Sequence, residues 1–285
     1  MISQKVKLHQ KQVLNDVGRL LDFSSPQVMG ILNVTPDSFY DGGRYHTINR
    51  ALKQCARMLQ EGAAVIDLGA YSSRPGARFI SEEEEIKRIL PLLKVIKKEF
   101  PNAVISIDTF RALVAELSVQ EGAQMINDIS AGELDSTMFA TVARLKVSYI
   151  LMHMKGNPQT MCEYAQYGED ILVELYSYFV RKIEQLRKLG VVDLIIDPGF
   201  GFAKTLEQNY ELLNRLDALN ELNLPMLVGV SRKTMIYKLL GITPTEALNG
   251  TTVIHTMALL KGANLLRVHD VKPAVEAVRI FNQLK

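Results

Sequence analysis

The chain has 285 residues, of which 47% are hydrophobic and 22% are charged, so it can bury a large core and disorder is not expected. Its 33 basic and 31 acidic residues leave a net charge of +2, which argues against nucleic acid and acidic membrane surfaces as partners. Cys55 and Cys162 lie far apart and outside any Cys/His cluster, which argues against structural zinc and against a disulfide framework.

The first 26 residues mix Lys, His, Gln and Asp with scattered leucines. They lack the apolar stretch of a secretory signal, and no apolar run in the chain is long enough to cross a bilayer. We expect residues 1–26 to form a short cap or hairpin, and we expect the protein to be cytoplasmic.

Residues 28–43 introduce a pattern that recurs along the chain. They begin as an apolar run, which indicates a strand buried on both faces, and then break at Asn33 into a loop rich in Asp, Pro and Gly. Seven more apolar runs open into loops in the same way, and amphipathic helices lie between them. The predicted strands are 28–33, 64–69, 103–109, 125–129, 147–154, 194–197, 225–230 and 265–270. The predicted helices include 47–60, 81–100, 138–145, 170–189, 234–240, 245–261 and 272–285.

Eight β-then-α units predict parallel strands joined by right-handed helical crossovers, and eight of them in this length predict a (β/α)8 TIM barrel. Glu61-Gly-Ala, Glu121-Gly-Ala and Lys261-Gly-Ala each end a predicted helix just before a strand, which supports the count. A doubly wound open sheet is the alternative, but no GxGxxG follows the first strand. We therefore expect one α/β barrel domain over residues 27–285.

Polar side chains stand at the end of the predicted strands, where the site of such a barrel is built. Ionisable groups there are costly unless they are paired or used. Any one of them could merely cap a helix or tie down a loop, and Asp67 is the first candidate for such a role. Together they predict one polar pocket, formed by Asn33, Asp67, Asp108, Asn127, His153, Asp197, Lys233, Arg267 and His269.

This pocket is expected to have two halves. Carboxylates, an amide and a lysine suit a flat heterocycle with amino, ring N–H and carbonyl groups, such as a pteridine. Arginine, hydroxyl and amide groups suit a phosphate or diphosphate, and a neutral oxygen ligand suits Mg²⁺ held chiefly by water and substrate phosphates. The first set is Asp108, Asn127, Asp197 and Lys233; the second is Asn33, Ser73, Arg74, Arg267 and His269.

Several of these residues also have plainer interpretations. Arg232 and Lys233 could simply begin a helix, and His269 could be a loop histidine. Phe200 and Phe202 are either core residues or, because glycines flank them, a shelf for a substrate ring. The Met and Leu rows of the late helices, such as Met257 and Leu260, are interpreted as core packing.

Eight motifs, one near each predicted strand, run in order from about residue 27 to the C-terminus. They are Asn33-Val-Thr-Pro-Asp-Ser-Phe, Ser73-Arg-Pro-Gly-Ala, Ser106-Ile-Asp-Thr, Ile126-Asn-Asp-Ile, Met152-His-Met with Gly156-Asn-Pro, Asp197-Pro-Gly-Phe-Gly-Phe, Gly229-Val-Ser-Arg-Lys and Arg267-Val-His-Asp. Together they resemble the dihydropteroate synthase family. Any single motif is weak, but eight in register are specific.

The resemblance implies a transferase of folate biosynthesis that condenses (7,8-dihydropterin-6-yl)methyl diphosphate with p-aminobenzoate to give 7,8-dihydropteroate and diphosphate. Sulfonamides would compete with p-aminobenzoate, and a homodimer formed through late helices is implied. The resemblance assigns residues to three groups: pterin binding to Asp108, Asn127, Asp197 and Lys233, diphosphate binding to Asn33, Ser73, Arg267 and His269 with Mg²⁺ on Asn33, and p-aminobenzoate binding to Pro75, Phe202 and Ser231.

Nothing among these residues resembles an activated nucleophile with its base, so a covalent enzyme intermediate is not expected. The resemblance implies a dissociative reaction, which fits this. Mg²⁺ and basic groups would stabilise charge on the departing diphosphate, the dihydropterin would stabilise the methylene cation, and the arylamine would attack it. The residues expected to be catalytic are Asn33, Arg74, Lys233, Arg267 and His269.

The chain departs from the commonest family pattern at two places. Tyr71-Ser-Ser73 stands where Glu-Ser-Thr is usual, and Ala203 stands where Gly is common. Ser73 retains a hydroxyl for a phosphate contact, whereas Tyr71 changes the second loop and with it the expected drug sensitivity or loop order.

Two other functions compete with this interpretation. A methyltetrahydrofolate–corrinoid methyltransferase would share the pterin acids but would not need the Ser-Arg-Lys and Arg-Val-His motifs. An inactive pterin-binding paralogue would be indicated by loss of Asp197, Lys233 or Arg267, and all three are present.

Overall fold

The computed structural model describes residues 12–14, 20–34, 44–70, 80–157, 165–168 and 170–284, with backbone only for 12–14, 20 and 44–47. Its strands are β1 (Gln12–Leu14), β2 (Leu20–Asp22), β3 (Gln27–Asn33), β4 (Val65–Gly69), β5 (Val104–Asp108), β6 (Met125–Asp128), β7 (Ser148–Met152), β8 (Leu194–Asp197), β9 (Leu227–Val228) and β10 (Leu265–Val268). Its helices are α2 (Arg44–Gln60), α3 (Glu82–Glu99), α4 (Ala112–Gln120), α5 (Met138–Leu145), α6 (Ile171–Lys188), α7 (Leu206–Asn214), α8 (Thr234–Leu240), α9 (Leu248–Leu260) and α10 (Val271–Phe281), with 3-10 helices η1 (Leu216–Leu222) and η2 (Asn282–Leu284).

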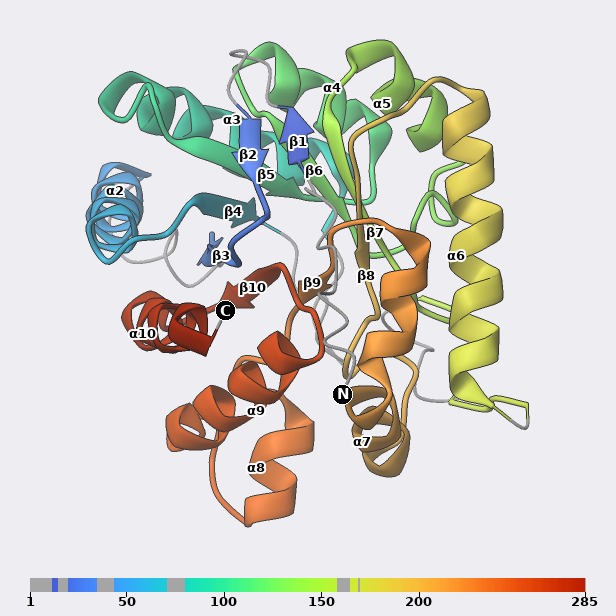
Figure 1. The fold of residues 1–285 in the computed structure, drawn as a ribbon. Coiled ribbons are helices and arrows are strands. Elements are labelled where there is room, and N and C mark those ends of the chain that lie inside the picture. Colours follow the sequence, from blue (N-terminus) through green and yellow to red (C-terminus); the bar gives the residue numbers. More distant parts are fainter. Residues whose placement is uncertain are drawn as a thin grey trace.

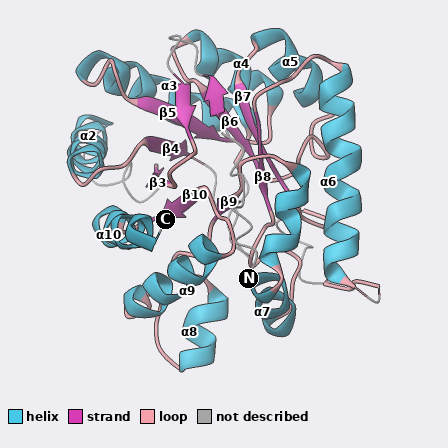
Figure 2. Cartoon of the chain, viewed as in Figure 1, coloured by secondary structure: helices cyan, strands magenta, loops and turns pink. Residues whose placement is uncertain are grey.

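Within the described residues, eight parallel strands pair in the order β8-β7-β6-β5-β4-β3-β10-β9. A single parallel bridge between Ile196 and Met226 joins β8 to β9 and nearly closes the sheet into a barrel. Figure 1 shows the helices around the outside of these strands, and Figure 2 shows the strands as the inner layer. The predicted (β/α)8 barrel is therefore confirmed.

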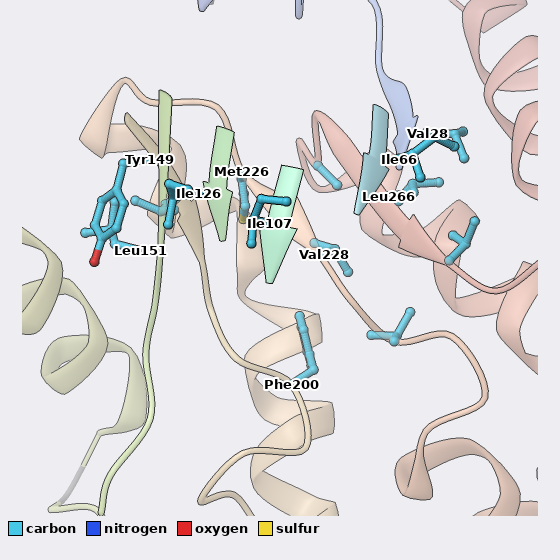
Figure 3. Packing of buried hydrophobic residues seen from close by; sticks show 14 of the residues in the cluster. Val28, Ile66, Ile107, Ile126, Tyr149, Leu151, Phe200, Met226, Val228 and Leu266 are labelled. Carbon is cyan, nitrogen blue, oxygen red and sulfur yellow. The ribbon is translucent and has the colours of Figure 1, made fainter. Parts of the chain in front are cut away.

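Alternation along each strand divides most of the apolar core between two of its three clusters. Side chains that point outward pack under the helices, and Figure 3 shows Val28, Ile66 and Tyr149 among them. Side chains that point inward fill the lower barrel, from Met29 on β3 to Leu265 on β10. Because successive strand residues face opposite sides, each barrel strand is apolar on both faces at this level.

The N-terminal strands β1 and β2 pair antiparallel. Just after β2, the buried ring of Phe23 joins the inward-pointing cluster, and Leu21 packs against it. Asn264 donates from Nδ2 to the carbonyl oxygen of Phe23 at 3.4 Å and so ties this segment to the start of β10. The segment therefore covers the amino-terminal end of the barrel. The extent of a separate cap over residues 1–26 stays a prediction.

Helix ends follow the sequence signals closely. Gly62, Gly122 and Gly262, the glycines of the three repeated Gly-Ala endings, all have positive φ, between 94° and 101°, which favours glycine. At the start of α3, Ser81 Oγ accepts a hydrogen bond from the Glu84 backbone N–H at 3.2 Å.

Some boundaries differ from the predicted ones. The seventh barrel strand has two residues rather than six, because within 225–230 only Leu227 and Val228 form a continuous ladder and Met226 makes an isolated bridge. Helix α9 begins at Leu248, not at residue 245, since Glu246 instead closes a turn by accepting hydrogen bonds from the backbone and hydroxyl of Thr243.

The interpretation of Met257 and Leu260 as core residues is wrong. Their exposed fractions are 47% and 62%, whereas Ile254, Ala258 and Leu259 form the buried side of α9. Apolar residues occur on both faces of this helix, so their spacing alone could not show which face is inside. Among the described residues, no helix combines the length and the hydropathy needed to span a membrane.

Candidate active site

A polar layer lies directly above the inward-pointing apolar cluster. Asp67, Asn127, Asp197 and Arg267 each stand two residues after a member of that cluster, on β4, β6, β8 and β10 respectively. Because side chains in a strand alternate between faces, all four share the inward direction of those apolar neighbours. The same alternation that fills the barrel floor thus places charged and amide groups inside its carboxyl end.

Arg267 lies between two carboxylates. Its Nε donates to Asp67 Oδ2 and its Nη2 donates to Asp108 Oδ2, both at 2.6 Å. Asn127 Nδ2 also donates to Asp67 Oδ2, at 3.0 Å. Asp67 is fully buried, and the side chain of Arg267 is 20% exposed. Asp67 therefore orients two predicted ligand-binding residues, which agrees with its interpretation as a structural acid.

Asp197 and Lys233 lie at the loop that follows β8. Asp197 Oδ1 accepts a hydrogen bond from the Gly199 backbone N–H at 2.8 Å. Lys233, at the start of α8, donates from Nζ to the Phe200 carbonyl oxygen at 2.5 Å, and this nitrogen lies 4.6 Å from the centre of the Phe202 ring. Phe200 itself is buried in the core, so the shelf interpretation stays open for Phe202 alone.

The ends of β9 and β10 are joined by Ser231 and His269. Ser231 Oγ lies 3.1 Å from His269 Nδ1 and accepts the His269 backbone N–H at 3.2 Å. Next to them, Arg232 binds both carboxylate oxygens of Asp270, at 2.7 and 2.9 Å. This bidentate pair explains Arg232 as a structural residue and distinguishes it from Lys233.

Burial shifts the pKa values of these groups. It raises the pKa of Asp108 to about 7, although Arg267 opposes the shift, and it raises the pKa of Asp197 against the opposing charge of Lys233. Burial lowers the pKa of Lys233 to about 8, with Asp197 opposing. Burial also disfavours the charge of Arg267, but Asp67 and Asp108 outweigh it and raise its pKa. A cluster of ionisable groups whose pKa values are shifted by burial and by their neighbours is typical of a functional site.

Asn33 ends β3 beside Gly69 and Asp108. A Cβ atom at position 69 would lie 3.2 Å from Asn33 Oδ1 and 3.3 Å from Asp108 Cβ, so the glycine makes room for both side chains. Among the described residues, no three His, Cys, Asp or Glu side chains are grouped as metal ligands.

The structure does not bring every predicted residue into this cluster. His153 follows the inward-facing Met152 of β7, so it takes the outward direction and contacts Lys204 at 3.1 Å behind the site. The prediction of His153 as a pocket residue is therefore wrong. Ser73, Arg74 and Pro75, together with Tyr71, lie outside the described residues.

Sequence reasoning missed Lys204. Its ammonium binds two carbonyl oxygens of the loop after β8, at Gly199 and Phe202. Nothing in the local sequence marks this role, because a lysine after a glycine-rich loop is normally solvated and the contacts depend on the tertiary fold.

Comparison with known proteins agrees with this geometry. Residues 29–269 match the family of pterin binding enzymes. The chain is 44% identical to the dihydropteroate synthase of Escherichia coli (strain K12) over 265 residues, which cover 92% of this chain and 93% of the relative. It is 43% identical to the dihydropteroate synthase of Synechocystis sp. over 260 residues, which cover 90% and 89% of the two chains.

Solved structures show the same likeness. The Yersinia pestis dihydropteroate synthase in a sulfonamide drug complex superposes with a TM-score of 0.89 at 40% identity, over 96% of this chain and 98% of that one. The Xanthomonas albilineans dihydropteroate synthase with 4-aminobenzoic acid gives a TM-score of 0.88 at 37% identity, over 97% and 98%.

A (β/α)8 barrel with this polar layer and these relatives defines the chain as a pterin-binding enzyme. Within that class the chain belongs to the dihydropteroate synthase family, the transferases of that name in folate biosynthesis.

Proposed function

We propose that the chain condenses (7,8-dihydropterin-6-yl)methyl diphosphate with p-aminobenzoate, giving 7,8-dihydropteroate and diphosphate. The observation that carries this proposal is the position of Arg267, which contacts Asp67 and Asp108 from β10 within the same polar layer as Asn127 and Asp197. A basic group suited to an anion therefore adjoins acids suited to a ring. One molecule that joins a pterin to a diphosphate would use both.

The pterin ring would bind to Asp108, Asn127, Asp197 and Lys233. Carboxylates accept hydrogen bonds from amino and ring N–H groups, and an ammonium donates to ring acceptors. Asp197 is buried and Asp108 is partly buried, so a neutral ring with several N–H donors would satisfy them without bringing in water.

The diphosphate would bind to Asn33, Ser73, Arg74, Arg267 and His269. A guanidinium has five N–H donors, and the contacts of Arg267 with Asp67 and Asp108 use two of them. The guanidinium is thus oriented by two acids while it keeps donors for an anion. Hydrogen bonds of this kind strengthen as charge grows on a leaving group.

Mg²⁺ fits this donor set only as an ion held mainly by the substrate. Asn33 offers one neutral oxygen, beside Gly69 and Asp108, and the described residues supply no metal-binding cluster. Such a ligand set suits Mg²⁺ that keeps water and phosphate oxygens around it. When bound, the ion would add positive charge at the diphosphate.

The protein residues would promote a dissociative substitution by positioning and charge stabilisation. Arg267 and His269 would hold the departing diphosphate, and the barrel acids would hold the dihydropterin while its methylene carbon loses that group. Ser231 and His269 are hydrogen-bonded to each other, so the amine-binding side adjoins the leaving-group side.

p-Aminobenzoate would lie near Pro75, Phe202 and Ser231. Solved relatives carry a sulfonamide drug or 4-aminobenzoic acid, which supports an aromatic amine site that sulfonamides would occupy in this chain. Phe202 would provide the flat surface for the ring.

The chain would act as a homodimer formed through its late helices. Val253, Met257 and Leu260 expose apolar surface on α9, and Ile280 and Leu284 do so on α10 and η2. Exposed apolar residues that gather on neighbouring helices are typical of a protein interface.

The direct test is to incubate the purified protein with the dihydropterin diphosphate, p-aminobenzoate and Mg²⁺. Equal amounts of dihydropteroate and diphosphate are expected. Tight binding of the pterin without any product would instead indicate an inactive paralogue.

A further inference from the structure

The loop after β8, residues 198–203, has an unusual backbone. Gly199, Gly201 and Ala203 all have positive φ, at 71°, 78° and 47°. A backbone that turns in this way makes no regular ladder, so its buried polar groups need other partners. The loop separates Asp197 from Lys204 and carries Phe202, so its shape sets part of the proposed site.

Two lysines bind three carbonyl groups of this loop. Lys233 binds the Phe200 carbonyl from the site side. Lys204 binds the carbonyl oxygens of Gly199 and Phe202, at 3.0 and 3.1 Å, and lies 3.1 Å from His153 Nδ1. An ammonium has three N–H donors, and these three acceptors match them.

His153 is suited to act as the third acceptor. It is 2% exposed and packs edge-to-face against the ring of Tyr178. Burial, together with the charges of Lys204 and Lys155, holds the pKa of His153 well below its ordinary value. The imidazole is therefore neutral at pH 7, and its Nδ1 can accept a hydrogen bond from Lys204.

Two further side chains complete the support behind the loop. Tyr167 donates its hydroxyl to the Ala203 carbonyl oxygen at 2.8 Å. Asn209 accepts the Gly201 N–H at 2.7 Å and donates to the Thr205 carbonyl oxygen at 2.6 Å. Lys204 is the member of this set that binds two carbonyl groups of the loop, those of Gly199 and Phe202.

We propose that Lys204 is a positioning residue for the reaction, which holds the 198–203 loop from behind so that Phe202 and the Phe200 carbonyl face the substrates in the correct place. This inference rests on the proposed function. Lys204 would act through the loop rather than by touching either substrate.

A role in stability alone would not account for a lysine here. Lys204 is partly buried, and withdrawing an ammonium from water is costly, whereas apolar side chains can often replace buried charged groups without loss of stability. Burial lowers the pKa of Lys204 to about 7 even though Asp197 favours its charge. The charge of Lys204 is therefore electrostatically unfavourable at this position, and the position lies beside a loop that carries site residues.

The test compares Lys204→Met with Lys188→Met, a control at an exposed lysine of α6 that also removes one positive charge. Because the chain has no tryptophan, dihydropterin fluorescence can report binding without interference from indole. At saturating dihydropterin diphosphate, Lys204→Met is expected to lower kcat/KM for p-aminobenzoate about tenfold or more, since small misplacements are costly in catalysis. It is also expected to weaken dihydropterin binding, whereas Lys188→Met should stay within about twofold of the native chain.

A double-mutant cycle separates positioning from general stability. If Lys204 positions p-aminobenzoate through Phe202, then Lys204→Met should cost less than about twofold in kcat/KM for p-aminobenzoate when Phe202→Ala is already present. An equal loss in both backgrounds, or no loss in either, would overturn the proposal. If Lys204→Met does not fold, Lys204→Gln is used instead, because it keeps N–H donors without the charge. Its loss in kcat/KM is then compared with and without Phe202→Ala.

Failure of the proposed function would look different. The native chain itself would then form no dihydropteroate. Dihydropterin binding would still decide the role of Lys204, because an unchanged dissociation constant in Lys204→Met would count against positioning and a weaker one would support it.

Discussion

Asp67 and Arg267 are joined by an ion pair in which Arg267 Nε lies 2.6 Å from Asp67 Oδ2, and the acid is fully buried. They come from β4 and β10, which both neighbour β3 in the sheet. The same carboxylate oxygen accepts from Asn127 on β6. One acid therefore fixes the geometry between the anion-binding and ring-binding halves of the proposed site.

Asp67→Ala should destabilise the protein by about 3–5 kcal/mol, because it leaves the partly buried Arg267 and the buried Asn127 without their shared acceptor. Urea unfolding followed by circular dichroism measures this. A loss below about 1 kcal/mol, the range of surface ion pairs, would show that Asp67 does not hold the two groups together.

The stability of the unliganded protein should fall with rising pH because of Asp108. Burial raises its pKa in the folded chain from the ordinary 3.8 to about 7. Between these values the folded state holds a proton that the unfolded state has released, so stability decreases as pH rises through this window. Asp108→Asn removes this dependence.

Unfolding free energies of Asp108→Asn and the native chain should be compared at pH 5 and pH 8. The difference in favour of the variant should be larger at pH 8, while its affinity for the pterin should be lower. A difference that is constant with pH, or larger at pH 5, would mean that Asp108 is ionised in the folded state at both pH values.

Gly199→Ala should be severely destabilising. A Cβ there would lie 2.1 Å from the His153 carbonyl oxygen, at a φ of 71°. Gly241 is the matched control, because it has a φ of 64° and no atom within 4 Å of its Cβ position. Gly241→Ala should lower the free energy of unfolding by about 1 kcal/mol, because of its left-handed conformation alone. Gly199→Ala should lower it by about 3 kcal/mol or more. Equal melting temperatures for the two variants would refute the close packing of this loop.

Met257→Glu should convert the proposed homodimer to a monomer, because a charge in an apolar interface is costly to desolvate. Light scattering at several concentrations measures the mass. Gln185→Glu, which adds the same charge on the exposed face of α6, should leave the mass unchanged. If the native chain is monomeric throughout, the interface on α9 and α10 does not exist.

The sequence predicts site residues correctly where the alternation of side chains along a strand decides which way a residue points. Asp197 and Arg267 follow apolar residues at inward positions, so their direction and their place at the strand ends were both readable. His153 was not, because it comes one residue later, after Met152 has taken the inward position. A shift of one residue reverses the side of a strand on which a side chain lies.

Two other features depend on tertiary contacts alone. Lys204 binds carbonyl groups of a loop whose shape is set by positive φ values at glycine and alanine. Met257 lies on a helix that is apolar on both faces, so only packing decides which face is exposed. The roles assigned to Ser73, Arg74 and Pro75 stay predictions, because these residues lie outside the described part of the chain.

Ligand binding to two variants can show whether a ring-binding half and an anion-binding half adjoin at the carboxyl end of the barrel. Dissociation constants should be measured for 6-hydroxymethyl-7,8-dihydropterin, which lacks diphosphate, and for the dihydropterin diphosphate. Asp197→Asn should weaken both ligands about tenfold or more, because it removes a charged acceptor for the ring that they share. Arg267→Lys should weaken the diphosphate about tenfold while leaving the free pterin within about twofold, because it replaces the planar guanidinium. If Arg267→Lys weakened both ligands equally, or Asp197→Asn weakened neither, the two halves would not be as described.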